Sequence, residues 1–148
     1  MNRFAAPVFA ALIGILTPLA AAPSAFAADL PGYVGNGGDA GVCSESWVLS
    51  KITRRFRHQV RHVPNLPDVE IVDFRRIHQH RYQPAGDAWP IGRRYCGATV
   101  ALSNGLDRTI WYLIEEGQGF ASIGDNVEFC VSGFDRWMVY NGRCRVLR

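Results

Sequence analysis

The sequence predicts an α+β fold, in which one N-terminal amphipathic helix packs on an antiparallel β-meander that is braced by disulfides. One stretch has the apolar period of a helix, whereas the later stretches alternate in the manner of strands and are separated by turn residues. Four cysteines lie in the same part of the chain. These features together favour a small domain with one helix, one sheet and covalent cross-links.

Residues 1–27 have the organisation of a secretory signal peptide. A start that carries Arg3 precedes an uncharged apolar run at residues 4–22, and small residues surround the cleavage site after Ala27. Prolines interrupt the apolar run and no cysteine lies near the cleavage site, so we expect neither a retained membrane helix nor a lipid anchor. The mature protein is therefore expected to be soluble and exported to the periplasm.

The mature chain divides into a lead-in and one domain. Residues 28–42 are rich in Gly, Asp and Ala and are expected to be a flexible segment, while residues 43–148 suffice for a single α+β domain with a modest core. Removal of the leader takes away Arg3 and no acid, so the formal net charge falls from +3 to +2. This charge is too small to indicate a nucleic-acid partner, and we expect none.

The helix is expected over residues 45–62. Its apolar residues recur at every fourth position, Ser44 or Ser46 can cap its start, and Arg and His gather in its last turn. Pro64 then ends it. The apolar stripe that should face the sheet consists of Val48, Ile52, Phe56 and Val60.

Strands are expected after Pro67. They cover residues 69–82, 94–102, 109–116 and 126–132, and a last strand is expected at residues 137–140. Asn104-Gly105 is a strong hairpin signal between the second and third strands. Trp111, Tyr112, Phe129 and Trp137 are expected to pack on the sheet.

The even number of cysteines in an exported chain indicates two disulfides. No C-x-x-C pair is present, so the spacing suits neither a zinc site nor a thioredoxin-like centre. Three pairings are open, and strand alternation favours one of them, because Cys96 shares the apolar face that should meet the helix and Cys130 lies on the opposite face. The favoured pairs are Cys43 with Cys96 and Cys130 with Cys144.

Neither catalysis nor metal binding is indicated. No serine lies in a G-x-S-x-G elbow, and Glu115 and Glu116 are neighbours on a strand whose side chains point to opposite faces. The pairs His58/His62 and His78/His80 each have ligand spacing, but the helical pair should face solvent among arginines that repel a cation. We therefore expect no enzyme, no cofactor and no metal.

Residues 117–126 form a glycine-rich connection that is either a structural turn or a contact loop. A strand precedes it and a strand follows it, so it lacks the helix that a phosphate-binding loop requires. Phe120 and Ile123 favour contact, since a plain solvent loop seldom carries both, and the alternative is that they pack back into the core. The candidate binding residues are Gln118, Gly119, Phe120, Ser122 and Ile123, whereas Asp125 counts against entry into an acidic cleft.

A second candidate surface is the basic face of the helix. It carries Arg54, Arg55, Arg57 and Arg61. Guanidinium groups suit carboxylates and other anions. This face predicts a non-enzymatic structural or ligand-binding protein of the cell envelope, as the alternative to a protein that binds through the loop.

The segments Tyr95-Cys96, 111–115, 119–121, 126–133 and Cys144-Arg145 resemble a group of small exported, disulfide-containing proteins of Gram-negative bacteria. The resemblance covers residues 43–148, and most proteins of the group have no assigned function. Small periplasmic proteins of this build include inhibitors of lysozyme and lytic transglycosylases. The resemblance thus implies a periplasmic or host peptidoglycan hydrolase as partner, with a surface loop inserted into its acidic cleft.

Overall fold

The computed structural model describes residues 40–148. The expected signal peptide at residues 1–27, and residues 28–39 of the expected lead-in, lie outside the described residues. Within the described part the order is η1 (Gly41–Ser44), α1 (Ser46–His62), β1 (Ile71–Gln83), β2 (Arg93–Leu102), β3 (Asp107–Glu115), η2 (Phe120–Ser122), β4 (Asn126–Val131) and η3 (Arg145–Leu147).

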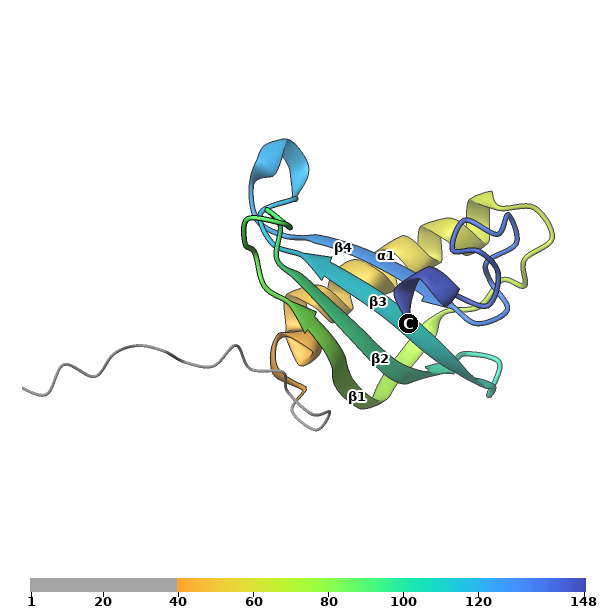
Figure 1. The fold of residues 1–148 in the computed structure, drawn as a ribbon. Coiled ribbons are helices and arrows are strands. Elements are labelled where there is room, and N and C mark those ends of the chain that lie inside the picture. The colour runs from red at the N-terminus through yellow and green to blue at the C-terminus, as the bar shows by residue number, and fades with distance from the viewer. Residues whose placement is uncertain (1–39) are drawn as a thin grey trace, which may run out of the picture.

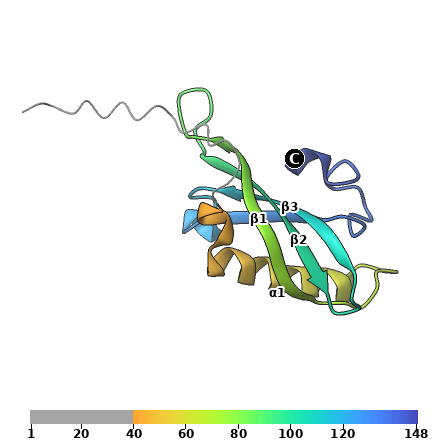
Figure 2. The same ribbon diagram turned by 90° about the horizontal axis from the view of Figure 1, so that it is seen from below.

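The described residues form an α+β fold with one α-helix and a four-stranded antiparallel sheet in the order β1-β2-β3-β4 (Figure 1). The helix α1 lies across one face of the sheet, and the C-terminal segment lies over the other face (Figure 2). The predicted α+β class and the antiparallel meander are therefore confirmed. No helix within residues 40–148 is long and apolar enough to cross a membrane.

The helix α1 buries the apolar stripe that its period predicts, since Val48, Ile52, Phe56 and Val60 are all buried. Burial of each such side chain stabilises the fold by roughly 1.5–3 kcal/mol. The helix ends at Val63, whose backbone is extended as expected before proline. The start differs from the prediction, because Glu45 is the N-cap residue and no side chain caps the helix.

The sheet separates two hydrophobic clusters. The cluster under α1 contains Cys43, Cys96 and the buried ring of Tyr112, whose hydroxyl donates a hydrogen bond of 2.7 Å to the carbonyl oxygen of Cys43. The cluster on the outer face contains Cys130, Cys144, Tyr95, Leu113 and Leu147. Disulfides join Cys43 to Cys96 and Cys130 to Cys144, so the favoured pairing is confirmed.

The C-terminal segment differs from the predicted strand at residues 137–140. Residues 137–140 form turns in place of the expected strand, and Trp137 is 66% exposed instead of packed on the sheet. The backbone N–H of Tyr140 donates to the Asp135 carboxylate at 3.1 Å, and Met138 has a φ of 56°. These local bonds, together with the Cys130–Cys144 disulfide, turn the chain back over the outer sheet face and prevent an extended strand.

The lead-in also differs at its end. Gly41–Ser44 forms a 3-10 turn, and Val42 packs against the inner cluster. The disulfide of Cys43 holds this turn against β2. The last residues of the expected flexible segment therefore belong to the folded domain.

Candidate functional site

The contact loop, residues 117–126, joins β3 to β4 and projects from one end of the sheet (Figure 1). Phe120 at its tip is 95% exposed and Ile123 is 79% exposed. Neither side chain packs back into the domain. The loop therefore presents two large apolar side chains to solvent, at 95% and 79% exposure among the exposed large apolar side chains of residues 40–148.

Hydrogen bonds within the loop hold its backbone in one shape. The N–H of Gly119 donates to the carbonyl oxygen of Gly124 at 2.8 Å, and the N–H groups of Ser122 and Ile123 donate to Gly119 and Phe120 at 3.0 Å each. A loop that satisfies its own polar groups loses little conformational entropy on binding. The geometry is thus that of a preformed contact element.

Glycine is required at two kinds of position in this loop. Gly117 and Gly124 have φ of 67° and 68°, which glycine adopts without steric cost. Gly119 has an ordinary φ, but a Cβ there would lie 2.0 Å from the carbonyl oxygen of Ile123. A side chain at position 119 would consequently push the two arms of the loop apart.

The side chain of Asp125 is hydrogen-bonded to the base of the loop. Its carboxylate accepts a hydrogen bond of 2.9 Å from the N–H of Gly117, so its charge is engaged at the base of the loop. Its backbone carbonyl accepts a hydrogen bond of 2.8 Å from Lys51 of α1. The acid that counted against entry into an acidic cleft is therefore part of the loop's own framework.

A hollow of about 390 Å³ lies beside the loop, lined by Trp47, Lys51, Ile123, Gly124 and Asp125. Burial of the Lys51 ammonium lowers its pKa, and the charges of Arg55 and Arg54 lower it further, while Asp125 acts in the opposite direction. The hollow combines an indole ring, an aliphatic side chain and a cation next to the exposed tip.

The base of the loop is anchored by paired charges. Arg93 donates to the Glu115 carboxylate at 3.1 Å, and Arg94 lies 3.3 Å from the carboxylate of Glu116. These pairs hold the end of β3 against β2. Gln118 and Ser122, by contrast, are exposed, and their side chains form no hydrogen bond to any residue among 40–148, so both remain able to bind a partner.

The four arginines of the basic face of α1 differ in their contacts. Arg55 donates to the carbonyl oxygen of Val127 at 2.5 Å, and Arg57 pairs with Glu70 at 2.6 Å. Arg54 and Arg61 form no ion pair with any residue in the described range. A separation of seven residues places these two on one side of the helix, about 10 Å apart. Arg57 is thus the arginine of this face whose charge is paired, whereas Arg54, Arg55 and Arg61 have no acidic partner among the described residues.

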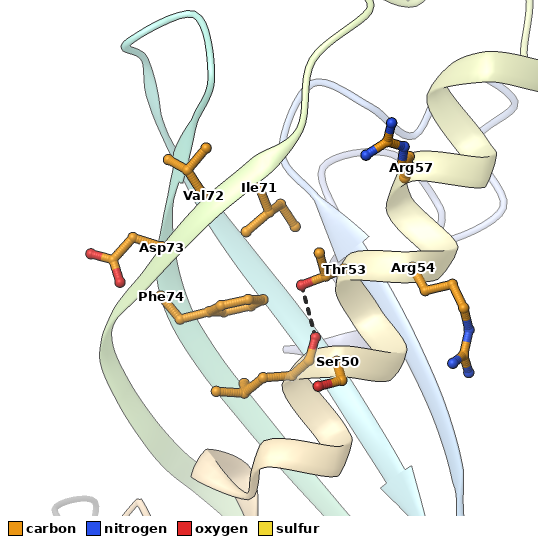
Figure 3. A pocket seen from close by; sticks show the side chains of 9 residues that line it. Ser50, Thr53, Arg54, Arg57, Ile71, Val72, Asp73 and Phe74 are labelled. Carbon is orange, nitrogen blue, oxygen red and sulfur yellow. Dashed lines mark hydrogen bonds between the residues drawn. The ribbon is translucent and has the colours of Figure 1, made fainter.

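A groove between α1 and β1 was not predicted from the sequence. Its volume is about 630 Å³, and Leu49, Thr53, Ile71, Phe74 and Arg57 contribute to its lining. Ile71 and Phe74 point toward the helix, whereas Val72 and Asp73 point away from it (Figure 3). The β-bulge between Ile71 and Asp73 causes this change of faces. A prediction that assumes strictly alternating side chains along the strand misses such a site, because no local sequence signal marks the bulge.

The four histidines remain as two separate pairs. The rings of His58 and His62 stack at 3.9 Å on the exposed side of α1, while His78 and His80 lie on the outer face of the sheet beside Trp111. Within residues 40–148 no three His, Cys, Asp or Glu side chains lie close enough to hold a metal ion.

Comparison with known proteins gives no relative from which a function can be transferred. No family model, no curated protein and no solved structure matches the chain.

Proposed function

We propose that this protein is a non-enzymatic periplasmic binding protein that inserts its contact loop into the substrate cleft of a lysozyme-like peptidoglycan hydrolase or lytic transglycosylase. The observation that carries the proposal is the exposure of Phe120 and Ile123 on a loop whose backbone is internally hydrogen-bonded. Burial of these two side chains in a partner contributes roughly 1.5–3 kcal/mol each. Their preformed presentation keeps the entropic cost of binding low.

The partner class follows from chemistry beside the loop and from the resemblance to small exported proteins. A peptidoglycan hydrolase has a long cleft with apolar sugar-binding walls and acidic catalytic groups. Lys51 places a cation next to Ile123, and Asp125 directs its carboxylate to Gly117 instead of to the partner. In this proposal, the exposed side chains of Gln118 and Ser122 replace hydrogen bonds that the hydrolase makes to sugar hydroxyls.

The test is a turbidity assay of peptidoglycan hydrolysis by several lysozymes and lytic transglycosylases, with and without an excess of the purified protein. We expect hydrolysis to slow for at least one of these enzymes. Phe120→Ala combined with Ile123→Ala should weaken inhibition by at least about 100-fold, because burial of two apolar side chains is lost. Unchanged hydrolysis by every enzyme in the panel contradicts the proposal.

A matched control is available at the other end of the sheet. Trp137 and Val139 are 66% and 67% exposed, so Trp137→Ala with Val139→Ala removes a comparable apolar area far from the loop. This variant should inhibit as well as the parent protein. Equal loss of inhibition in both variants would show that neither loop residue has a specific role.

The second candidate function uses the basic side of α1, and the unpaired state of Arg54 and Arg61 among the described residues favours it. In this case the protein binds an anionic component of the envelope. Arg54→Gln with Arg61→Gln should then abolish binding to isolated cell envelopes, whereas the Phe120 and Ile123 variant should bind normally. Loss of envelope binding in the Phe120 and Ile123 variant, with normal binding by the Arg54 and Arg61 variant, supports binding through the contact loop.

A further inference from the structure

The C-terminal segment, residues 135–148, carries a second exposed apolar surface. Trp137, Met138, Val139 and Val146 are 66%, 72%, 67% and 57% exposed. The segment lies at the end of the sheet away from the contact loop, on the face opposite α1 (Figures 1 and 2). We call these four side chains, together with the arginines of the segment, the C-terminal patch.

The patch is strongly basic. Its arginines are Arg136, Arg143, Arg145 and Arg148, and its only acid is Asp135. None of these arginines forms an ion pair with any residue in the range 40–148. Arg145 donates to the carbonyl oxygen of Asn141 at 3.1 Å, and Arg148 donates to the carbonyl oxygen of Arg143. The guanidinium charges are therefore not neutralised within the described domain.

Asp135 is the one acidic side chain among residues 135–148 and opposes four arginines, so three arginine charges are left unbalanced. The carboxylate of Asp135 is engaged by the N–H of Tyr140 at 3.1 Å. Burial raises the pKa of the Tyr140 hydroxyl, and the charges of Glu128 and Asp135 raise it further against the opposite effect of Arg55. Neither Glu128 nor Asp135 forms an ion pair with an arginine of the patch among the described residues.

The patch is held rigidly although its apolar side chains are exposed. Cys144 and Leu147 are 0% and 1% exposed and anchor the segment on the outer sheet face, with Cys144 bonded to Cys130. The N–H of Asn141 donates to Met138 at 2.9 Å and that of Met138 donates to Asp135 at 3.2 Å. The exposed side chains thus stand on a fixed turn and do not depend on folding upon binding.

We propose that the C-terminal patch binds the surface of an anionic lipid bilayer. Indole rings favour the boundary between headgroups and acyl chains, and neighbouring aliphatic side chains insert just below it. Arginines around these inserted side chains are attracted by the negative surface potential of the bilayer. Each arginine increases partitioning of the protein onto the bilayer by about fivefold. The contact is peripheral and needs neither a membrane-spanning helix nor a lipid anchor.

A bilayer fits the shape of the patch better than a folded protein partner. The hollow beside Trp137 and Val139 has a volume of about 50 Å³, which leaves little room for a side chain of a protein partner. The apolar side chains are more than half exposed, and a fluid surface accommodates exposed side chains without shape complementarity. At a membrane, the contact loop at the other end of the sheet would remain free to meet its own partner.

The experiment is sedimentation of the purified protein with phosphatidylcholine vesicles that contain or lack phosphatidylglycerol. We expect binding to the anionic vesicles, weakening as salt rises, and little binding to the neutral ones. Arg136→Gln with Arg143→Gln should reduce partitioning by about 25-fold, since neither side chain holds the fold together. The separate variant Trp137→Ala with Val139→Ala should lose most of the vesicle binding that the parent protein shows.

The matched control is Phe120→Ala with Ile123→Ala, which should bind anionic vesicles like the parent. Absence of vesicle binding, equal binding to both vesicle types, or normal binding by the Trp137 and Val139 variant overturns the proposal. A concentration-dependent dimer that this variant abolishes, without vesicle binding, overturns it in favour of contact between copies. None of these outcomes depends on hydrolase inhibition, so the two proposals fail separately.

Discussion

At the scale of single residues, His80 is the polar side chain whose environment is least compatible with charge. Its ring lies 5.1 Å from Trp111 and 6.1 Å from Tyr95, and neither ring nitrogen has a hydrogen-bond partner among residues 40–148. Burial lowers its pKa from the ordinary 6.5, and the charges of His78 and Arg81 lower it further. The outer sheet face therefore accepts His80 in its neutral form.

This environment predicts a pH dependence of stability. Because the folded-state pKa lies below the unfolded value, the unfolded chain binds the proton more readily, and the free energy of unfolding should fall as pH decreases below about 6.5. The loss continues until the pH reaches the folded-state pKa. Urea unfolding at a series of pH values should show a smaller decrease for His80→Gln than for the parent.

His58→Gln is the matched control for this titration, because His58 is exposed on α1. It should keep the pH dependence of the parent, including the contribution of the carboxylates that both proteins share. If His80→Gln and the parent lose stability in parallel, the ring of His80 is not protected from protonation in the folded state.

Tyr112 shows a different role for a buried polar group. Its hydroxyl is fully satisfied by the Cys43 carbonyl, and burial raises its pKa well above the ordinary value of 10.0. The bond joins β3 to the turn before α1, next to the Cys43–Cys96 disulfide. The hydrogen bond of Tyr112 thus helps to hold the start of the domain in place. The ring nitrogens of His80, by contrast, have no hydrogen-bond partner among residues 40–148.

At the scale of elements, the contact loop depends on the absence of a side chain at Gly119. Gly119→Ala should distort the loop, because the added Cβ would meet the Ile123 carbonyl at 2.0 Å. Inhibition of the target hydrolase should fall at least about tenfold, while the midpoint of urea unfolding changes little, since the strands themselves are not touched. A turbidity assay and a urea titration measure the two effects.

Gly86 supplies the matched glycine control, because a Cβ there meets no atom within 4 Å and its backbone does not require glycine. Gly86→Ala should leave inhibition and stability unchanged. Full inhibition by Gly119→Ala would mean that the shape of the loop is irrelevant to binding.

The strand β1 is the element whose pattern departs most from simple alternation. Register shifts occur near Ile71, Arg75 and Gln79, and Arg76 has a φ of 53°. Bulges of this kind bend an edge strand and hinder its pairing with another chain. The bulge between Ile71 and Asp73 also shapes the groove between β1 and α1. The same bulge therefore hinders pairing of the edge strand with another chain and forms part of a surface groove.

At the scale of the whole molecule, the two disulfides fix opposite faces of the sheet. Cys43–Cys96 closes 53 residues under the helix, and Cys130–Cys144 closes 14 residues on the outer face. Chain-entropy estimates give stabilisation of about 4 kcal/mol for the first and about 3 kcal/mol for the second. The domain should therefore depend more strongly on the first disulfide.

The prediction is tested by comparing Cys43→Ala/Cys96→Ala with Cys130→Ala/Cys144→Ala in urea unfolding. The first variant should lose more stability, and the second should lose less but release the C-terminal patch, which limited proteolysis of residues 135–148 detects. A larger loss of stability in the second variant, or equal protection of the tail in both, contradicts this division of roles.

The sequence by itself determined the features that depend on neighbouring residues. The four-residue apolar period predicted α1, Asn104-Gly105 predicted the β2–β3 turn, and alternation favoured the observed disulfide pairing. It also marked residues 117–126 as a connection between two strands, but it left open whether this connection is a turn or a contact loop. These properties arise from side-chain period and turn preference, which act over a few residues.

Only the tertiary structure decided which polar groups are free. Arg55 and Lys51 donate to carbonyl groups 72 and 74 residues away, and the carboxylate of Asp125 accepts a hydrogen bond from Gly117 at the base of its own loop. The exposure of Trp137 likewise follows from a turn that the distant Cys130 helps to hold. Such outcomes depend on strand register and long-range contacts, because a side chain is available for binding only when no distant group in the fold has already satisfied it.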